Sequence, residues 1–388
     1  MLFTAPLIHN GYKFLPAGSM VEVNDSGVIT AIHYGLQNED VIEYQGILCP
    51  GFVNVHCHLE LSHLRNSIPE HTGLIPFLQQ IPIIRGKFSR EEIRFARHEA
   101  YQELRNHGVV AVGDIANVTD TLDLRALNDL HVHTFVECIG FTEQYAPQRF
   151  KASRHTYKTF AAQQQKDKIL RQSIVPHAPY SVSKTLFDFI DKHQPQSIIS
   201  IHNQESLAEN EFYQNKTGAV NNLLSGLGIE YDFFQATGKS SLQTYTQWLS
   251  DEHPIIFVHN TYTTKEDVEI AVDRFRQTYW CLCPNANLYI ENTLPDVTML
   301  AAAGLNMCIG TDSLASNHQL CVFSELLTLK KKIPLLQWEV LLQWATSNGA
   351  KALDMNEQVG SLEVGKQPGL LNISDLSESA NPVIERII

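Results

Sequence analysis

Four side chains that can bind a metal stand at or just beyond the ends of apolar, strand-like segments. They are His56 and His58 after residues 52–55, His202 after residues 198–201, and Asp312 beyond residues 307–309. Alternate residues of an extended segment point to the same side, so His56 and His58 can face one point. Three neutral imidazoles and one carboxylate suit a divalent cation, zinc foremost, with iron or manganese as alternatives. Because such a set leaves one coordination position for water, the pattern predicts a catalytic metal site.

The elements that must position these side chains read as alternating strands and helices. Apolar strand candidates lie at residues 52–55, 109–112, 133–138, 173–176, 198–201, 255–258, 280–283 and 307–309. Apolar residues recur at helical spacing between most of them, as in residues 90–107 and 184–193. Eight strands that alternate with helices close a (β/α)8 TIM-type barrel, whose functional side chains lie at the carboxyl ends of the strands.

The two ends of the chain differ from this α/β pattern. Residues 1–48 and 359–388 consist of short strand-like segments separated by turn signals. We expect these two segments to pair into one small β-sandwich domain beside the barrel. The predicted division is therefore 1–48 and 359–388 for the β domain, and 49–358 for the barrel that carries the metal site.

The composition of the 388-residue chain is that of an ordinary folded protein. Hydrophobic residues make up 44% and charged residues 18% of it, which excludes a mainly disordered chain. With 29 Lys and Arg against 42 Asp and Glu, the formal net charge is −13, and the basic residues are scattered. Nucleic-acid binding needs a basic surface that neutralises phosphates. The sequence thus favours a small-molecule partner over a nucleic acid.

We expect a cytoplasmic protein that does not enter a membrane. No apolar run approaches the ~20 residues that a bilayer-spanning helix needs, and the N-terminal segment lacks the pattern of a signal peptide. Seven cysteines are an odd number spread thinly over a long chain, which is not the pattern of a disulfide framework. Reduced thiols in a cytoplasm fit this usage better.

A series of short motifs runs along nearly the whole chain. In order, they are PGFVNVHCHLELS, VPHAPYSVS, SIHNQES, FVHN, CPNANLYI, IGTDSLASN and GSLEVGK. Together they resemble the amidohydrolase superfamily, specifically its branch of deaminases and chlorohydrolases that act on aminated heterocycles. The order of the motifs is specific for the superfamily and much less specific for the substrate.

This resemblance implies a role for each candidate residue. It implies catalytic roles for Glu205, which follows ligand His202 by three residues, and for His259 at the end of the sixth barrel strand. It also implies that His177 contacts the substrate. The modified lysine that bridges two ions in binuclear members has no counterpart here, which implies a single metal ion. The implied ligands of that ion are His56, His58, His202 and Asp312.

Each acid or base of this set can take part in hydrolytic deamination. A metal can lower the pKa of bound water from about 15.7 to about 7, and the metal-bound hydroxide then attacks the carbon that bears the amine. Asp312 can accept the proton of the water, and His259 can share that role or hold the attacking oxygen. Glu205 is expected to carry protons to the ring nitrogen and to the leaving amine. We therefore expect a hydrolase of carbon–nitrogen bonds, acting foremost on a purine nucleoside derivative.

Two segments bear on the substrate. Residues 58–62 (HLELS) resemble aminodeoxyfutalosine deaminases, which remove the 6-amino group of an adenine base on a modified ribose. Glu60 or Ser62 could hydrogen-bond the substrate or could only cap the following turn. Deaminases of thiomethyl- or homocysteinyl-adenosines resemble this chain, but they carry an acid for the ribose hydroxyls near the position of Arg85. Arg85 either faces the pocket, where it would favour an anionic substituent, or lies exposed.

Two other functions compete with deamination. The same residues could expel chloride, a thiol or an alkylamine from a triazine or pyrimidine, and ammonia or chloride as the product distinguishes these cases. A catalytically silent binding protein on this scaffold is the third hypothesis, but such a protein would be expected to have lost ligands, and all four are present. A homodimer is a further expectation, because barrels of this type often dimerise.

Overall fold

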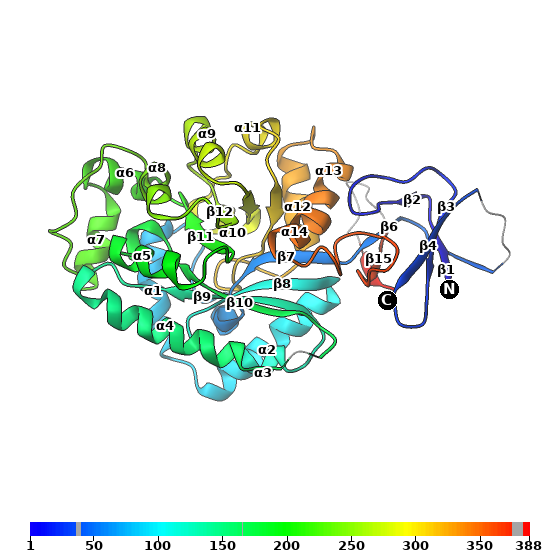
Figure 1. The fold of residues 1–388 in the computed structure, drawn as a ribbon, viewed down its shortest axis with the longest axis horizontal. Helices are drawn as coiled ribbons and strands as arrows, with labels where there is room; N and C mark the ends of the chain where they lie inside the picture. The colour runs from blue at the N-terminus through cyan, green and yellow to red at the C-terminus, as the bar shows by residue number, and fades with distance from the viewer. Residues whose placement is uncertain (36–39, 165, 375–382) are drawn as a thin grey trace.

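An α/β barrel forms the larger end of the molecule, and two small β-sheets form the other end (Figure 1). The computed structural model describes residues 1–35, 40–164, 166–374 and 383–388. Both chain termini lie at the end that holds the small sheets. The expected α/β class, a TIM-type barrel with a small β domain built from both ends of the chain, is confirmed.

Eight parallel strands of the described chain form the wall of the barrel. They are β7 (Phe52–Cys57), β8 (Val109–Ala116), β9 (His131–Cys138), β10 (Leu170–Pro176), β11 (Ile199–Asn203), β12 (Ile255–His259), β13 (Thr278–Leu282) and β14 (Met307–Ile309). They hydrogen-bond in two arcs, β7-β8-β9-β10 and β11-β12-β13-β14. Nearly every residue in them is buried, as expected for parallel strands that are covered on both faces.

The two arcs meet at seams that are closed by backbone hydrogen bonds beside the predicted site. His202 N donates to His177 O at 3.0 Å, which links β11 to the end of β10. Thr311 N and Asp312 N each donate to His56 O at 3.0 Å, which links the segment after β14 to β7. These bonds lie at the carboxyl ends of the strands. Closing the barrel therefore brings the predicted metal ligands together.

Helices cover the barrel and connect its strands (Figure 1). Helix α2 begins with a capping box in which Ser89 and Glu92 each accept the other's backbone N–H, and Ser183 caps the start of α5. Residues 90–107 and 184–193, expected as helices, match α2 and α5. The helices are α1 (Leu74–Arg85), α2 (Arg90–Asn106), α3 (Leu122–Arg125), α4 (Ala146–Ala161), α5 (Lys184–His193), α6 (Leu207–Asn215), α7 (Ala219–Gly226), α8 (Ser241–Tyr245), α9 (Lys265–Arg274), α10 (Pro284–Glu291), α11 (Val297–Ala302), α12 (Val322–Lys332), α13 (Trp338–Gln343) and α14 (Gly349–Ala352).

The strands agree with the apolar segments of the sequence except at their ends. β7 continues to Cys57, so His56 lies within the strand and not beyond it. The ladder with β8 extends this far, because Cys57 still pairs with Asp114. Backbone pairing does not require apolar side chains, so the strand continues beyond the apolar segment from which it is predicted.

The small domain is a sandwich of two four-stranded sheets. Their orders are β4-β3-β1-β5 and β16-β15-β6-β2. Phe3, Val21, Leu48 and Leu370 belong to the apolar cluster that fills the sandwich. Strands from both chain ends therefore share one core. The strands are β1 (Leu2–Thr4), β2 (Leu7–Ile8), β3 (Ser19–Val23), β4 (Ile29–Tyr34), β5 (Val41–Glu43), β6 (Ile47–Pro50), β15 (Leu370–Ser374) and β16 (Val383–Arg386).

A single glycine connects the sandwich to the barrel. Gly51 lies between β6 and β7, and a Cβ atom at this position would stand 2.2 Å from Val110 Cγ1 and 2.8 Å from Pro368 O. Both distances are far inside van der Waals contact. A residue without a side chain is thus required where the chain passes from the small domain into the first barrel strand.

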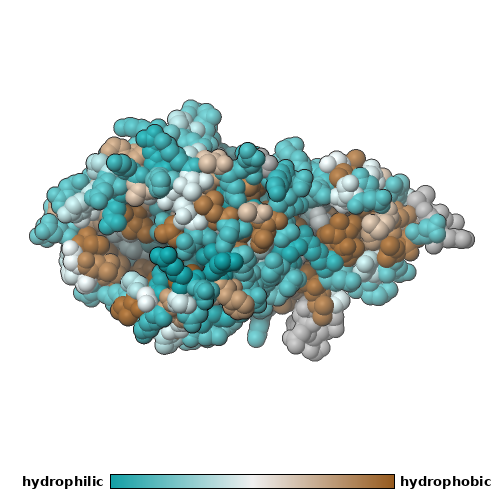
Figure 2. All heavy atoms as spheres, turned by 90° about the horizontal axis from the view of Figure 1, so that it is seen from below, coloured by the Kyte–Doolittle hydropathy of each residue, from teal (hydrophilic) through white to brown (hydrophobic). Residues whose placement is uncertain are grey.

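Hydrophobic side chains on the surface lie in separate groups among hydrophilic ones, over the barrel and over the small sheets (Figure 2). Isolated exposed residues such as Phe95 and Leu335 are ordinary for a folded protein. Among the described residues, no helix combines the length and the apolar character that crossing a membrane requires.

Candidate metal centre and active site

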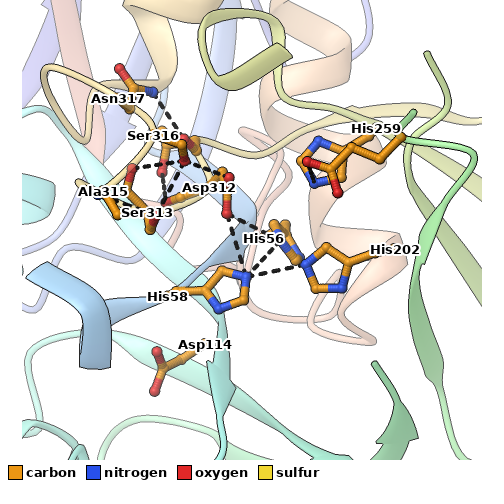
Figure 3. Close-up of polar contacts among 12 residues, drawn as sticks. His56, His58, Asp114, His202, His259, Asp312, Ser313, Ala315, Ser316 and Asn317 are labelled. Atoms are coloured by element: carbon orange, nitrogen blue, oxygen red, sulfur yellow. Dashed lines mark hydrogen bonds and ion pairs between the residues drawn. The ribbon is translucent and has the colours of Figure 1, made fainter. Parts of the chain in front are cut away.

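The four predicted metal ligands converge at the carboxyl ends of the strands (Figure 3). His58 Nε2 lies 3.1 Å from His56 Nε2 and 3.3 Å from His202 Nε2. Asp312 Oδ1 lies 3.4 Å from His58 Nε2 and 3.6 Å from His56 Nε2. Donor atoms around a tetrahedral zinc ion are about 3.3 Å apart, given metal–nitrogen bonds of about 2.0–2.1 Å. The four side chains therefore fit one divalent cation.

The backbone beside the ligands takes conformations that side chains rarely adopt. The φ angle is +57° at Asp312, +72° at His259 and +46° at Gln204. Left-handed conformations of non-glycine residues cost about 1–3 kcal/mol each and concentrate at functional sites. Gly310 allows the approach of β14 to β7, because a Cβ there would lie 2.8 Å from His56 Cβ.

Hydrogen bonds behind the ligands fix their orientation. His202 Nδ1 donates to His177 O at 2.8 Å, so the lone pair of Nε2 faces the other donors. Ser316 Oγ donates to Asp312 Oδ2 at 2.6 Å, which leaves Oδ1 toward the histidines. Such outer contacts set the tautomer and direction of metal ligands.

The protonation states of the ligands also suit a cation. Burial lowers the pKa of His58 to about 3 and the pKa of His202 well below its usual value, so both imidazoles stay neutral. Burial alone would raise the pKa of Asp312, but the hydrogen bond with His56 and the nearby histidines hold this pKa below its usual range. Neutral imidazoles and an ionised carboxylate are the forms that bind metals.

Glu205 and His259 form a second pair beside the metal donors. Glu205 Oε1 lies 3.7 Å from His259 Nε2, and both side chains are buried. Burial, and then the charge of Asp312, raise the pKa of Glu205 well above its usual value. Neither ring nitrogen of His259 accepts or donates a hydrogen bond within the described part of the chain. A buried imidazole nitrogen without an ordinary hydrogen bond at a cavity wall is available to a ligand in the cavity.

A cavity of about 330 Å³ opens above these residues. His58, His202, Glu205, His259 and Asp312 line it together with a mostly apolar wall. Helix α1 supplies much of that wall and α7 adds to it. The apolar residues include Leu61, Phe77, Leu78, Ile81, Leu223 and Ile290. A pocket that is apolar apart from one group of convergent polar residues is typical of a small-molecule site.

Three of the four predicted substrate contacts line the cavity, and the fourth, Ser62, does not. His177 lines the cavity, and its Nδ1 lies 2.7 Å from Ser181 Oγ. Arg85, at the end of α1, also lines it. Glu60 reaches the wall, with Oε1 3.5 Å from Arg85 Nη1. Ser62 lies outside the cavity, because its Oγ donates to Leu59 O at 2.8 Å and closes a turn.

Two further wall residues were not singled out from the sequence. Glu137 stands near the carboxyl end of β9, and Asn117 directly follows β8. Asn117 Nδ2 donates to Glu137 Oε2 at 2.9 Å. The signal in the sequence is an acid at the carboxyl end of an apolar strand, the position at which barrels carry functional residues.

The comparisons with known proteins agree with this site. Residues 47–384 match the model of the amidohydrolase family. The chain belongs to the amidohydrolase family. Membership confirms the expected metal-dependent hydrolase of carbon–nitrogen bonds, and the donor set confirms a site for one divalent metal ion.

This amidohydrolase is similar to several characterised proteins. It is 28% identical over 329 residues to an adenosine deaminase of Helicobacter pylori, an alignment that covers 84% of this chain and 78% of the relative. The crystal structure of Helicobacter pylori aminofutalosine deaminase with methylthio-coformycin superimposes with a TM-score of 0.81 at 22% identity, covering 98% of this chain and 93% of the other. A zinc-bound adenosine deaminase from Xanthomonas campestris gives a TM-score of 0.71 at 22% identity, with coverages of 97% and 85%.

Proposed function

We propose that this amidohydrolase deaminates a purine nucleoside, adding water at the carbon that carries the amino group and releasing ammonia. The observation that carries the proposal is the placement of Glu205 and His259 beside four metal donors at one end of an apolar cavity. The deaminases among its relatives support it. A flat purine with a polar edge is the kind of ligand that such a cavity holds.

The metal-binding residues supply the first part of the chemistry. His56, His58, His202 and Asp312 would hold the ion, and this donor set, together with the zinc of a related deaminase, favours zinc over iron or manganese. When bound, zinc supplies a Lewis acid that makes water nucleophilic near neutral pH. Asp312, an ionised carboxylate, is placed to accept the proton of the attacking water. His259 is placed to hold the attacking oxygen by a hydrogen bond.

Glu205 performs the proton transfers to the substrate. Its raised pKa keeps a proton on the carboxyl before the reaction. Glu205 gives this proton to the ring nitrogen beside the attacked carbon, where negative charge builds up. The resulting carboxylate takes one proton that comes from the attacking water and passes it to the amine, so that ammonia leaves as a neutral molecule. The second proton of that water restores the acid form of Glu205.

The outer part of the cavity selects the substituent on the nucleoside. The apolar wall from α1 and α7 suits a hydrophobic or aromatic group, and Arg85 at its rim suits an anionic one. An aromatic carboxylate, as in aminodeoxyfutalosine, satisfies both. His177 and Glu60 complete the polar wall around the substrate.

The proposal also covers the cell compartment, the domain organisation and the oligomeric state of the enzyme. All seven cysteines are buried and free, which fits a reducing cytoplasm. We infer a catalytic barrel of residues 49–358 with a β domain of residues 1–48 and 359–388. A homodimer, expected from the barrel class, would be detected by sedimentation of the purified protein.

The direct test is ammonia release by the zinc-loaded protein from adenosine, methylthioadenosine, adenosylhomocysteine, aminodeoxyfutalosine, guanine and an aminated triazine. We expect one adenine nucleoside to exceed the others by orders of magnitude in kcat/KM. Release of chloride from a chlorinated triazine without any nucleoside deamination would replace the proposal with the chlorohydrolase alternative. Inactivity toward the whole panel, with zinc bound, would overturn it.

A further inference from the structure

Glu137 places a carboxyl group in the cavity wall with one oxygen bound and the other available. Its side chain is 2% exposed. Oε2 accepts the hydrogen bond from Asn117 Nδ2. Oε1 lies 3.4 Å from His202 Nδ1, but the proton of that nitrogen goes to His177 O at 2.8 Å. Among the described residues, Glu137 Oε1 thus accepts no well-formed hydrogen bond.

The other acids of the cavity are already occupied. Glu60 Oε2 accepts the backbone N–H groups of Asn117 at 3.0 Å and of Val118 at 3.4 Å, and its Oε1 faces Arg85. Asp312 uses one oxygen for Ser316 and the other for the metal donors. Glu205 is assigned to proton transfer at the reacting atoms of the substrate. Glu137 is therefore the cavity acid with an oxygen, Oε1, that can accept a hydrogen bond from a part of the substrate other than the reacting base.

The surroundings hold this carboxyl in place before a substrate arrives. Glu60 fixes the backbone of Asn117, and the side chain of Asn117 fixes Glu137. The position is also one imidazole ring away from the reacting centre, because Glu137 faces Nδ1 of His202 whereas the metal donors face Nε2. A base placed at the metal donors would leave this carboxyl to contact another part of the ligand.

Ribose hydroxyls match the vacant oxygen chemically. A hydroxyl donates a hydrogen bond, and a buried carboxyl oxygen that lacks one is costly to leave unpaired. Acids bind ribose hydroxyls in this way in dinucleotide-binding folds. Next to Glu137 the wall also holds apolar Ile139, and nitrogens of His177 and His202 lie within 4.8 Å of the carboxyl.

We propose that Glu137 is a specificity residue that accepts hydrogen bonds from the ribose hydroxyls of the nucleoside. The proposal rests on the proposed function, because it needs a nucleoside whose base lies at the metal. It adds that the enzyme selects a ribonucleoside over the dideoxynucleoside with the same base.

The test compares a ribonucleoside with its 2′,3′-dideoxy analogue in the wild type and in Glu137→Gln, both zinc-loaded. An amide N–H in place of the accepting oxygen would leave the ribose hydroxyls without an acceptor, which predicts that kcat/KM for the ribonucleoside falls by roughly 10-fold, mainly through KM. We expect kcat/KM for the dideoxy analogue to change less than threefold. Zinc content, measured by elemental analysis, should equal that of the wild type.

Glu325→Gln is the matched control. Glu325 is equally buried, receives hydrogen bonds from Asn285 and Asn317, and does not line the cavity. Its ratio of ribonucleoside to dideoxynucleoside kcat/KM should equal the wild-type ratio. Equal losses for both substrates in Glu137→Gln, or a loss of zinc, would assign Glu137 to the support of His202 and overturn the inference alone. A wild type that deaminates no nucleoside would overturn the proposed function together with it.

Discussion

Two carboxyl groups in the same cavity are pushed toward opposite protonation states. The nearby histidines hold the pKa of Asp312 below its usual range, whereas burial and the charge of Asp312 raise the pKa of Glu205. Carboxyls whose pKa values are separated in this way divide into a base and an acid. Residue type does not distinguish them, since the difference comes from what each carboxyl faces.

Replacing Glu205 with Gln should lower kcat by about 10²- to 10⁴-fold, because the shuttling proton is lost. Zinc content should stay the same, since Glu205 is not among the four donors. Steady-state kinetics and elemental analysis check both points. Glu211→Gln, on α6 and outside the cavity, is the control and should retain activity. A fully active Glu205→Gln variant with zinc bound would contradict the mechanism.

Replacing Arg85 with Met should raise KM for a nucleoside that carries a carboxylate on its substituent, by roughly 10-fold or more, because a charge-assisted contact is lost. A nucleoside with an uncharged substituent should be affected little. Lys87→Met removes the same charge just beyond α1 and outside the cavity, so its kinetics should match the wild type. A wild-type KM for the carboxylate-bearing nucleoside in Arg85→Met would remove Arg85 from the substrate site.

At the scale of the elements, the strand ends decide which histidines can act. His58, His202 and His259 stand at or just beyond carboxyl ends and line the cavity, whereas His131 and His133 begin β9 at the opposite end. His133 stacks on Phe135 at 4.2 Å between ring centroids, and its Nε2 lies 3.1 Å from Ser173 Oγ. The same His-x-His spacing thus places metal donors at the end of one strand and packs into the core at the start of another.

His133 should make stability depend on pH. Burial lowers its pKa in the folded protein to about 3, against 6.5 for an unperturbed histidine. Its contribution is therefore complete above pH 6.5 and is lost as the pH falls, by roughly 2 kcal/mol at pH 5. Urea unfolding of the metal-free protein at pH 7 and pH 5 tests this. The midpoint should fall more for the wild type than for His133→Gln, and parallel falls would contradict the assignment.

At the scale of the whole molecule, the metal joins distant parts of the chain. The four predicted ligands come from β7 and the residue after it, from β11 and from the segment after β14, and they lie beside the seams that close the barrel. The large apolar cores of the barrel do not include these residues. The fold should therefore form without metal and gain stability when the metal binds.

Zinc should raise the thermal midpoint of the chelator-treated protein by about 5 °C at a thousandfold excess over its dissociation constant, since binding to the native state adds about 4 kcal/mol. Differential scanning calorimetry measures the shift. His58→Ala should unfold cooperatively but respond much less to zinc. An unfolded chelator-treated protein would show instead that the metal is needed for folding.

The sequence by itself determined the barrel and the sandwich, and it predicted the metal ligands and the catalytic pair that the fold brings together. It could do so because buried parallel strands read as apolar runs, and because barrels carry their chemistry where those runs end. It could not place Ser62 in a turn, or show that Glu60 is held by backbone N–H groups while Glu137 keeps one oxygen available. Those differences arise from segments that approach one another only in the folded chain. Only the tertiary structure decided them, since a hydrogen bond depends on distance and direction in space, whereas residue type and spacing describe the chain alone.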